Sequence, residues 1–328
     1  MVDRPELSPG LLAQMAQQGG VFTAEQAAAH GHHIREIQRL RTRPPRPLIS
    51  VRRGVYAWRE EYEAAEPGPR HLLDIRAAYL RLTDNVVLSH QSAALVLGLE
   101  LLDADLSLLH VTRQPPATPH VEAGIAHHVA ELPAHQRVVR VGALDHTTLA
   151  RTAVDVARDT SRMACAVAAF DSALRMDVPK AELREVFDRC RSWPGARLVA
   201  RAIDMADGRA DNPGESFSRV VLVQLGLAPD DLQVPVYDEE GLVGFADFGW
   251  QGVLGEFDGK GKYGVGDPSA DPDRAVRKVW QEKRREDRLR VGHEVVRWGM
   301  AELYQPQRLR GRVLAAMARA VARGLRPA

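Results

Sequence analysis

The sequence is poor in cysteine and in aromatic residues, and it contains no long apolar run. Its 328 residues include two cysteines, Cys165 and Cys190, and only 5% aromatic side chains. Neither cysteine has His or Cys companions at ligand spacing, which argues against a disulfide framework or a cysteine-based zinc site. No apolar stretch approaches the roughly 20 residues of a membrane-spanning helix. The N-terminus also lacks the basic and apolar segments of a signal peptide. We therefore expect a cytoplasmic protein that does not contact membranes.

Charge is nearly balanced over the whole chain but unevenly distributed along it. The formal net charge is +1, from 44 basic and 43 acidic side chains. Residues 1–60 carry nine basic and five acidic side chains, residues 61–273 carry 20 and 33, and residues 274–328 carry 15 and five. Two basic ends that flank an acidic middle predict two surfaces that face a polyanion. The alternative is that the arginine-rich helices only reflect a biased composition.

The N-terminal segment predicts three short helices in succession. Ser8 and Pro9 open the first helix, and Gly19 follows its end. Thr23 caps the second helix, and Gly31 separates it from the third. The aliphatic residues of the third helix recur at a spacing that turns them inward, and they are Ile34, Ile37 and Leu40.

A hairpin is expected after the third helix. The segment PLISVRRGVYAW alternates like two strands joined at Arg52, Arg53 and Gly54. Helix, short turn, helix and hairpin predict a winged helix-turn-helix DNA-binding domain over residues 1–60. Its outward side chains would reach phosphates and base edges, and they are His33, Arg35, Gln38, Arg39, Arg41, Arg52 and Arg53. A small helical domain for protein interaction is the alternative.

Residues 61–160 predict a middle α/β domain, and residues 161–210 predict a layer of connecting helices. The segment VVLSHQSAALVLGL begins as a strand and becomes a helix, and LSLLHVTR and VVRVG predict further strands. Ser89 is interpreted as a helix cap, because nothing like a nucleophile elbow surrounds it. His127 and His128 are interpreted as solvent-facing strand residues without a partner at metal-binding spacing.

The C-terminal part contains a helix, three strands, a basic helix and a further strand, and this order predicts the core of a PD-(D/E)XK nuclease. Residues of equal parity share one face of a strand, so Glu256, Asp258 and Lys260 lie together. An antiparallel neighbour can bring Asp247 beside them, and Glu215 on the preceding helix can complete the cluster. Such carboxylates repel one another unless a cation lies between them, and carboxylates with water are the ligands that Mg²⁺ prefers.

The predicted domain spans residues 211–328, and its expected catalytic residues are Glu215, Asp247, Glu256, Asp258, Lys260 and Lys262. The four carboxylates would hold Mg²⁺, or Mn²⁺ in its place, and the ion would activate a water against a scissile phosphate. Lys260 would orient that water or stabilise the transition state. The basic helix would contact the DNA backbone through Lys283, Arg284 and Arg285. The alternative is a structural sheet in which Lys260 and Lys262 neutralise Glu256 and Asp258.

Several segments resemble known families. FTAEQAAAHG, IQRL and LISVRRGVY resemble the N-terminal winged-helix domain of AbiEi-family antitoxins from type IV toxin–antitoxin systems. LSHQSAALVLGL and LARTAVDVARD resemble the segment after the winged helix in large actinobacterial relatives. GESFSRVVLVQLGL, VGFADFGW, GEFDGKGKYG and EKRREDRLRVGHEVVRW resemble the endonuclease-like domain related to very-short-patch-repair nucleases. This resemblance implies Glu215, Asp247 and Glu256 as the acidic metal positions, with Asp258 where lysine is usual.

We therefore expect a mixed α/β protein with an N-terminal winged helix, a middle α/β domain and a C-terminal restriction-endonuclease-like core. One expected function is DNA binding in a toxin–antitoxin or phage-defence setting, with a Mg²⁺-dependent nuclease-like domain that hydrolyses phosphodiesters. The alternative is a non-enzymatic AbiEi-type antitoxin and transcriptional autorepressor, with an inactive nuclease fold and a toxin as partner. The retained acidic positions favour the first, and Asp258 in place of lysine favours the second. Modification of RNA is a third option.

Overall fold

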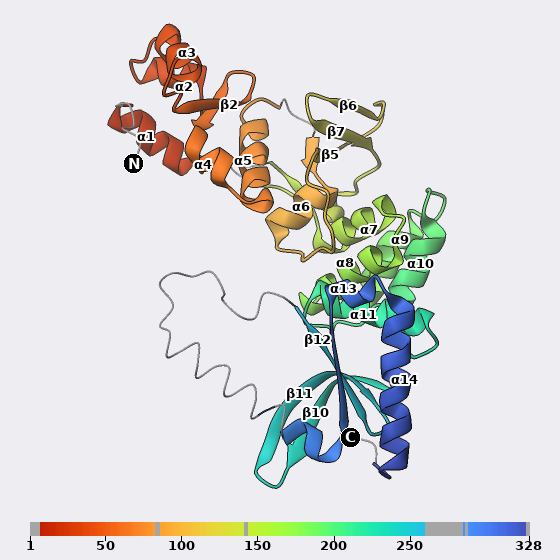
Figure 1. Cartoon of the computed structure of the whole chain (residues 1–328). Coiled ribbons are helices and arrows are strands. Elements are labelled where there is room, and N and C mark those ends of the chain that lie inside the picture. Colours follow the sequence, from red (N-terminus) through yellow and green to blue (C-terminus); the bar gives the residue numbers. More distant parts are fainter. Residues whose placement is uncertain (1–6, 83–85, 141–143, 260–284, 286–287, 326–328) are drawn as a thin grey trace. The chain divides into compact units, whose positions relative to one another are not determined.

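The computed structural model shows a mixed α/β protein (Figure 1), as expected from the sequence. The structure describes residues 7–82, 86–140, 144–259, 285 and 288–325. The chain divides into two compact units. Unit 1 comprises Met1–Leu99 and Ala104–Val156, and unit 2 comprises Glu100–Asp103 and Ala157–Ala328. The finer division into four domains stays a prediction.

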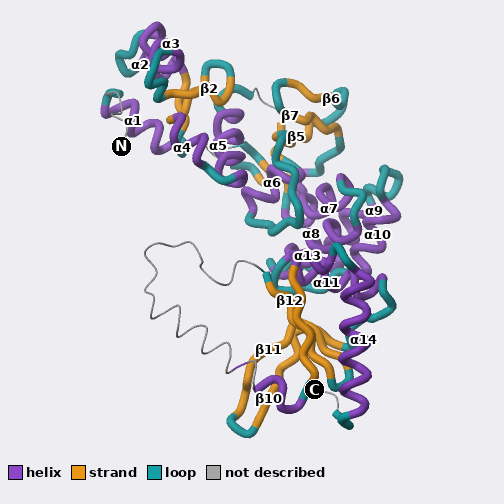
Figure 2. The backbone as a smooth tube through the Cα atoms, in the orientation of Figure 1, coloured by secondary structure: helices purple, strands orange, loops and turns teal. Residues whose placement is uncertain are grey.

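Unit 1 begins with helices and strands interleaved along the chain (Figure 2). In chain order these elements are α1 (Pro9–Gln17), β1 (Val21–Thr23), α2 (Ala24–Ala29), α3 (Ile34–Thr42), β2 (Leu48–Arg52) and β3 (Val55–Trp58). The strands form an antiparallel sheet in the order β1-β3-β2. Thr23 caps α2 as expected: its side chain accepts a hydrogen bond from the Gln26 amide, and the Gln26 side chain bonds the Thr23 amide in return.

The burial of the three aliphatic residues of α3 differs in part from the prediction. Ile37 is fully buried and Leu40 is partly buried, whereas Ile34 is 39% exposed. Ile34 is the first residue of α3, so no preceding helical turn covers its side chain. The inward face of this short helix therefore depends on Ile37, which packs with Leu11, Phe22 and other apolar residues of one core cluster.

The rest of unit 1 is built around a six-stranded mixed sheet with the strand order β6-β7-β5-β4-β9-β8. Its strands are β4 (Val86–Leu88), β5 (Leu109–Arg113), β6 (His120–Glu122), β7 (Ile125–Val129), β8 (Arg137–Val138) and β9 (His146–Thr147). Its helices are α4 (Arg59–Ala64), α5 (Pro67–Tyr79), α6 (His90–Leu97), the short 3-10 helix Ala134–Gln136, and α7 (Leu149–Asp159), whose last residues belong to unit 2. Ala77 of α5 packs with Val21, Val55 and Ala57, so one apolar cluster joins α5 to the N-terminal sheet.

Unit 2 contains a helical layer followed by a four-stranded sheet. Its helices are α8 (Met163–Arg175), α9 (Lys180–Asp188), α10 (Ala196–Met205), α11 (Pro213–Gln224), α13 (Met300–Leu303) and α14 (Pro306–Ala322). Its strands are β10 (Asp231–Asp238), β11 (Gly241–Trp250), β12 (Val253–Asp258) and β13 (Glu294–Gly299). The strand order is β10-β11-β12-β13, and β12 and β13 run parallel. Residues 288–292 are helical and precede β13, so the described part has the expected order of elements.

Two glycines allow close contacts with β12: Gly214 brings α11 close to it, and Gly255 makes room for the Trp298 ring. A Cβ on Gly214 would lie 2.1 Å from the Phe257 ring, and one on Gly255 would lie 2.6 Å from the Trp298 ring. The Trp298 indole also donates a hydrogen bond of 2.9 Å to the Ser218 hydroxyl on α11. These contacts fix the first turn of α11 against the sheet. No helix in the described part of the chain combines the length and the apolar character that crossing a membrane requires.

Candidate functional site

The exposed side of α3 carries the cations that the sequence predicts there. His33, Arg35, Gln38, Arg39 and Arg41 are all exposed. A shallow hollow of about 480 Å³ lies on this side, and it is lined by Arg35, Glu36, Gln38, Arg39, Thr42 and Arg43. Glu36, the acidic residue of α3, lies 3.2 Å from the His32 ring. Within the described ranges, the arginines of α3 form no ion pair, so their charge is available to a ligand.

The two arginines at the hairpin tip have different environments. Arg52 folds back on unit 1: its Nη1 donates to the Ala123 carbonyl at 2.9 Å, and its Nε donates to the Asp74 carbonyl at 3.4 Å. Burial lowers the pKa of Arg52, and the nearby Asp74 carboxylate opposes that shift. Arg53 is exposed. Arg52 therefore holds the hairpin in place, and Arg53 adds an exposed charge at the hairpin tip.

The carboxylate of Glu215 is buried among hydrogen-bond donors. The residue is 2% exposed. Its oxygens accept hydrogen bonds from the Asp211 amide at 2.7 Å, from Asn212 Nδ2 at 2.6 Å and from Gln233 Nε2 at 3.1 Å. Asn212 in turn caps α11 through its side-chain oxygen. These bonds contribute to compensating the buried charge and fix the position of the Glu215 carboxylate.

The carboxylate of Glu256 pairs with arginine on both of its oxygens. Glu256 is 8% exposed. Its Oε1 lies 2.7 Å from Arg285, and its Oε2 lies 2.6 Å from Arg297 on the neighbouring β13. Glu256 is thus ion-paired within the sheet by two arginines. Lys260 and Lys262, the partners in the alternative that the sequence left open, lie outside the described residues. Arg285, predicted to contact DNA, also donates to the Phe245 carbonyl at 2.9 Å.

Asp247 lies on the neighbouring strand β11, and Asp258 lies two residues after Glu256 at the end of β12. The Asp247 carboxylate accepts a hydrogen bond of 2.7 Å from the Phe257 amide, and Asp258 is exposed at the end of β12. Among the described residues, the predicted acidic cluster does not form a group of three carboxylates close enough to share a metal ion. The predicted residues Lys260, Lys262, Lys283 and Arg284 lie outside the described residues. The Mg²⁺ site stays a prediction.

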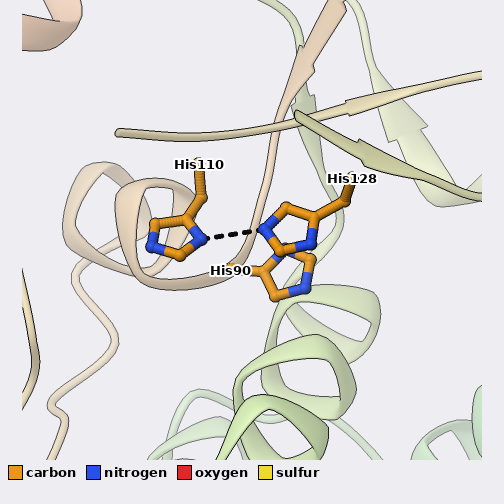
Figure 3. Close-up of side chains that lie close together, drawn as sticks. All are labelled: His90, His110 and His128. Carbon is orange, nitrogen blue, oxygen red and sulfur yellow. Dashed lines mark hydrogen bonds between the residues drawn. The ribbon is translucent and has the colours of Figure 1, made fainter. Parts of the chain in front are cut away.

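Three histidines that the sequence analysis did not bring together do meet in unit 1 (Figure 3). His90 opens α6, His110 lies on β5, and His128 lies on β7. One potential ligand atom from each lies within 4.8 Å of the other two. His110 Nδ1 is 2.9 Å from His128 Nε2, and the His90 ring stacks on the His128 ring with centroids 3.8 Å apart. In the described part of the chain, this is the one group of three or more such residues with the proximity that a metal ion requires.

The structure corrects the expectation that His127 and His128 both face solvent. His127 is 5% exposed and accepts a hydrogen bond of 3.0 Å from Arg113 Nε, and His128 is half-buried. Ser89 is the residue that precedes α6, as expected, but its side chain does not cap the helix. Its hydroxyl lies 2.9 Å from His90 Nδ1 and accepts a hydrogen bond of 2.8 Å from Thr112. No local motif predicts this cluster, because each histidine comes from a different element.

Comparisons with known proteins assign no family. No family model matches the chain. The uncharacterized protein MT2308 of Mycobacterium tuberculosis strain CDC 1551 / Oshkosh and the uncharacterized protein Rv2248 of strain ATCC 25618 / H37Rv are each 36% identical over 121 residues. Each match covers 35% of this chain and 44% of the relative, so the chain spans less than half the length of these curated relatives. The crystal structure of the RV2827C protein from Mycobacterium tuberculosis is 15% identical, with a TM-score of 0.42 over 72% of this chain and 90% of that chain.

Proposed function

We propose that this protein binds DNA through a winged helix in unit 1, with α3 as the recognition helix and the β2–β3 hairpin as the wing. The element order α1-β1-α2-α3-β2-β3 and the sheet order β1-β3-β2 support this assignment. The observation that carries it is a set of exposed arginines with no carboxylate partner in the described part of the chain: Arg35, Arg39, Arg41, Arg43 and Arg53.

Phosphate binding explains why such arginines stay unpaired. A guanidinium group that already pairs with a carboxylate must break that pair before it contacts a phosphate. The α3 arginines have no such pair to break, and each phosphate that they neutralise releases condensed counterions from the duplex. Arg52 contributes differently, because its bonds to Ala123 and Asp74 fix the hairpin against the rest of unit 1. It would position the wing, and Arg53 would contact the backbone.

Replacement of Arg39 and Arg41 by alanine tests this function. We expect weaker binding to a duplex of random sequence, because phosphate contacts do not depend on sequence. The slope of log K against log salt concentration should fall in magnitude by about 1.8 if each arginine neutralises one phosphate. Fluorescence anisotropy at several salt concentrations measures both quantities.

The matched control replaces Arg189 and Arg191, two exposed arginines of unit 2 with the same spacing along the chain. Their side chains are 51% and 68% exposed, and they pair with Glu185 and Asp188. This variant removes the same charge, but from arginines that lie outside α3 and already pair with carboxylates. It should therefore bind DNA as the wild type does. Unchanged binding by the α3 variant, or an equal loss in both variants, would contradict the assignment.

The geometry around Glu256 favours a protein that does not hydrolyse DNA, and we therefore propose a non-enzymatic role such as an autorepressor or an antitoxin of the AbiEi type with a toxin partner. A Mg²⁺ ion at Glu256 would have to displace two guanidinium groups, at 2.7 and 2.6 Å. In a buried position, removal of such partners is costly. The restriction-endonuclease-like core would then serve as a scaffold.

Metal-dependent nicking of DNA is the second candidate. The register that pairs Phe248 with Gly255 would place Asp247 opposite Glu256 one step further along the strands. Incubation with supercoiled plasmid, with and without Mg²⁺ or Mn²⁺, separates the two candidates. If the wild type nicks DNA, Asp247→Asn should abolish nicking and Asp231→Asn, on the exposed start of β10, should retain it. Equal nicking by the two variants would refute this site, and no nicking by the wild type would support the non-enzymatic function.

A further inference from the structure

We propose that His90, His110 and His128 bind one divalent transition-metal ion, for which Zn²⁺ is the best match. This site lies in unit 1 and is independent of the predicted Mg²⁺ site in unit 2 and of the basic surface of α3. The ligand set consists of three imidazoles (Figure 3) and contains no carboxylate. Neutral nitrogen ligands suit Zn²⁺ and its transition-metal neighbours, whereas Mg²⁺ and Ca²⁺ require oxygen ligands.

The pairing of β5 with β7 sets two of the ligands side by side. These strands run parallel, and the register pairs His110 with Ala126 and Thr112 with His128. His110 Nδ1 and His128 Nε2 face each other at 2.9 Å, a distance that requires a shared proton in the metal-free protein. In a tetrahedral zinc site with Zn–N distances near 2.0–2.1 Å, the ligand nitrogens lie about 3.3 Å apart. Binding would replace the proton, lengthen this nitrogen–nitrogen distance only slightly, and turn the two rings, whose planes now differ by 14°, so that both nitrogens aim at the ion.

His90 completes the site and must reorient when the ion binds. Its ring plane makes an angle of 17° with that of His128, and nitrogen lone pairs in nearly parallel planes do not converge on one point. A rotation of the His90 ring out of this stack aims Nε2 at the ion. His90 Nδ1–H then donates to the Ser89 hydroxyl, which lies 2.9 Å away and is held by Thr112. A ligand histidine usually makes this kind of second hydrogen bond, because it fixes the tautomer.

The backbone at the start of α6 also indicates a constrained position. His90 has a φ of 51°, a left-handed backbone conformation that residues other than glycine seldom adopt because Cβ crowds the following carbonyl oxygen. This conformation places the His90 side chain, 2% exposed, against the rings from β5 and β7. His128 is only half-buried, so an ion can enter on its side and a water can supply the fourth ligand, as in zinc sites with an open position.

Zinc titration of the untagged chain of 328 residues tests the proposal. Isothermal calorimetry in the presence of a competing chelator should show one Zn²⁺ bound per chain. His128→Gln removes one ligand at the most exposed position and should weaken Zn²⁺ binding at least about 100-fold, beyond the effect of losing a supporting hydrogen bond. The matched control is His120→Gln. His120 stacks on His127 with centroids 4.4 Å apart on the same sheet, but it lies outside the cluster, so the affinity should not change.

A second readout requires no variant. The Co²⁺-loaded wild-type protein should show the intense visible absorption of a tetrahedral site, and zinc X-ray absorption should detect imidazole nitrogens as the protein ligands. Circular dichroism confirms that each variant is folded, and if His128→Gln unfolds, these wild-type spectra decide the question. The proposal is overturned if the wild type binds no Zn²⁺, if Co²⁺ shows a six-coordinate spectrum, or if His120→Gln loses as much affinity as His128→Gln.

Discussion

The arginines of α3 and those of the C-terminal sheet have opposite environments. On α3, at the residue that follows it and at the hairpin tip, five arginines are exposed to solvent, and none pairs with a carboxylate of a described residue. In unit 2, Glu256 and Glu294 each accept two arginines, and these are Arg285 and Arg297 for the first and Arg319 and Arg323 for the second. Residues 274–328 carry the larger positive net charge, yet several of their described arginines are used within the fold. Net charge alone therefore does not identify a surface that is available to a polyanion.

Burial explains the difference. The side chain of Glu256 is 10% exposed and that of Glu294 is 14% exposed, and a carboxylate with so little water requires compensating charge. On α3 the guanidinium groups remain hydrated, so nothing in the fold requires a partner for them. The unpaired arginines form no ion pair that would stabilise unit 1. Binding of a ligand is therefore the better explanation for their presence on α3.

Replacement of Glu256 by glutamine is the strongest test of this contrast. It removes the carboxylate charge that two partly buried guanidinium groups face, so we expect a loss of about 3 kcal/mol in the unfolding free energy of unit 2. Urea titration followed by tryptophan fluorescence measures it, because Trp250 and Trp298 lie in the same sheet. Glu240→Gln is the control, since Glu240 is 82% exposed and lies 3.8 Å from its arginine.

The sign of this effect separates structure from catalysis. A loss like that of the control would show that the arginines do not depend on Glu256. A gain in stability would indicate that Glu256 is kept for a function at the expense of the fold, as catalytic residues often are. That result would restore the nuclease interpretation of unit 2 and would remove the contrast with α3.

Local signals in the sequence predict many of the elements. Ser8, Pro9 and Thr23 mark the starts of α1 and α2 where the structure has them. The order of α11 and strands β10 to β12 also follows from turn residues and alternation. Helix α14 is absent from the predicted elements, although its sequence carries the signal: apolar residues at helical spacing, Leu309, Val313, Ala316 and Ala320, are its buried side.

The side-chain partners could not be predicted, because they depend on pairings between distant segments. Arg297 meets Glu256 only because β13 pairs in parallel with β12. His110 and His128 are 18 residues apart and meet only because β7 pairs with β5. Alternation within one strand shows which face a residue occupies, but it does not show which strand lies beside it. The sequence alone therefore assigns the carboxylates to a metal and the histidines of β7 to solvent.

A smaller test places a carboxylate among the α3 arginines and so makes α3 resemble the C-terminal sheet. Gln38 is exposed on α3, three residues after Arg35 and three before Arg41, so Gln38→Glu provides an ion-pair partner at helical spacing. We expect DNA binding about tenfold weaker, equivalent to about 1.4 kcal/mol, measured by anisotropy at low salt. Unfolding stability should change by less than about 0.5 kcal/mol, because exposed ion pairs contribute little.

The control is Gln17→Glu, an exposed position on α1, which adds the same charge elsewhere in unit 1 and should leave binding nearly unchanged. If both variants weaken binding equally, the total charge of unit 1 determines the affinity, and the unpaired state of the α3 arginines has no functional meaning.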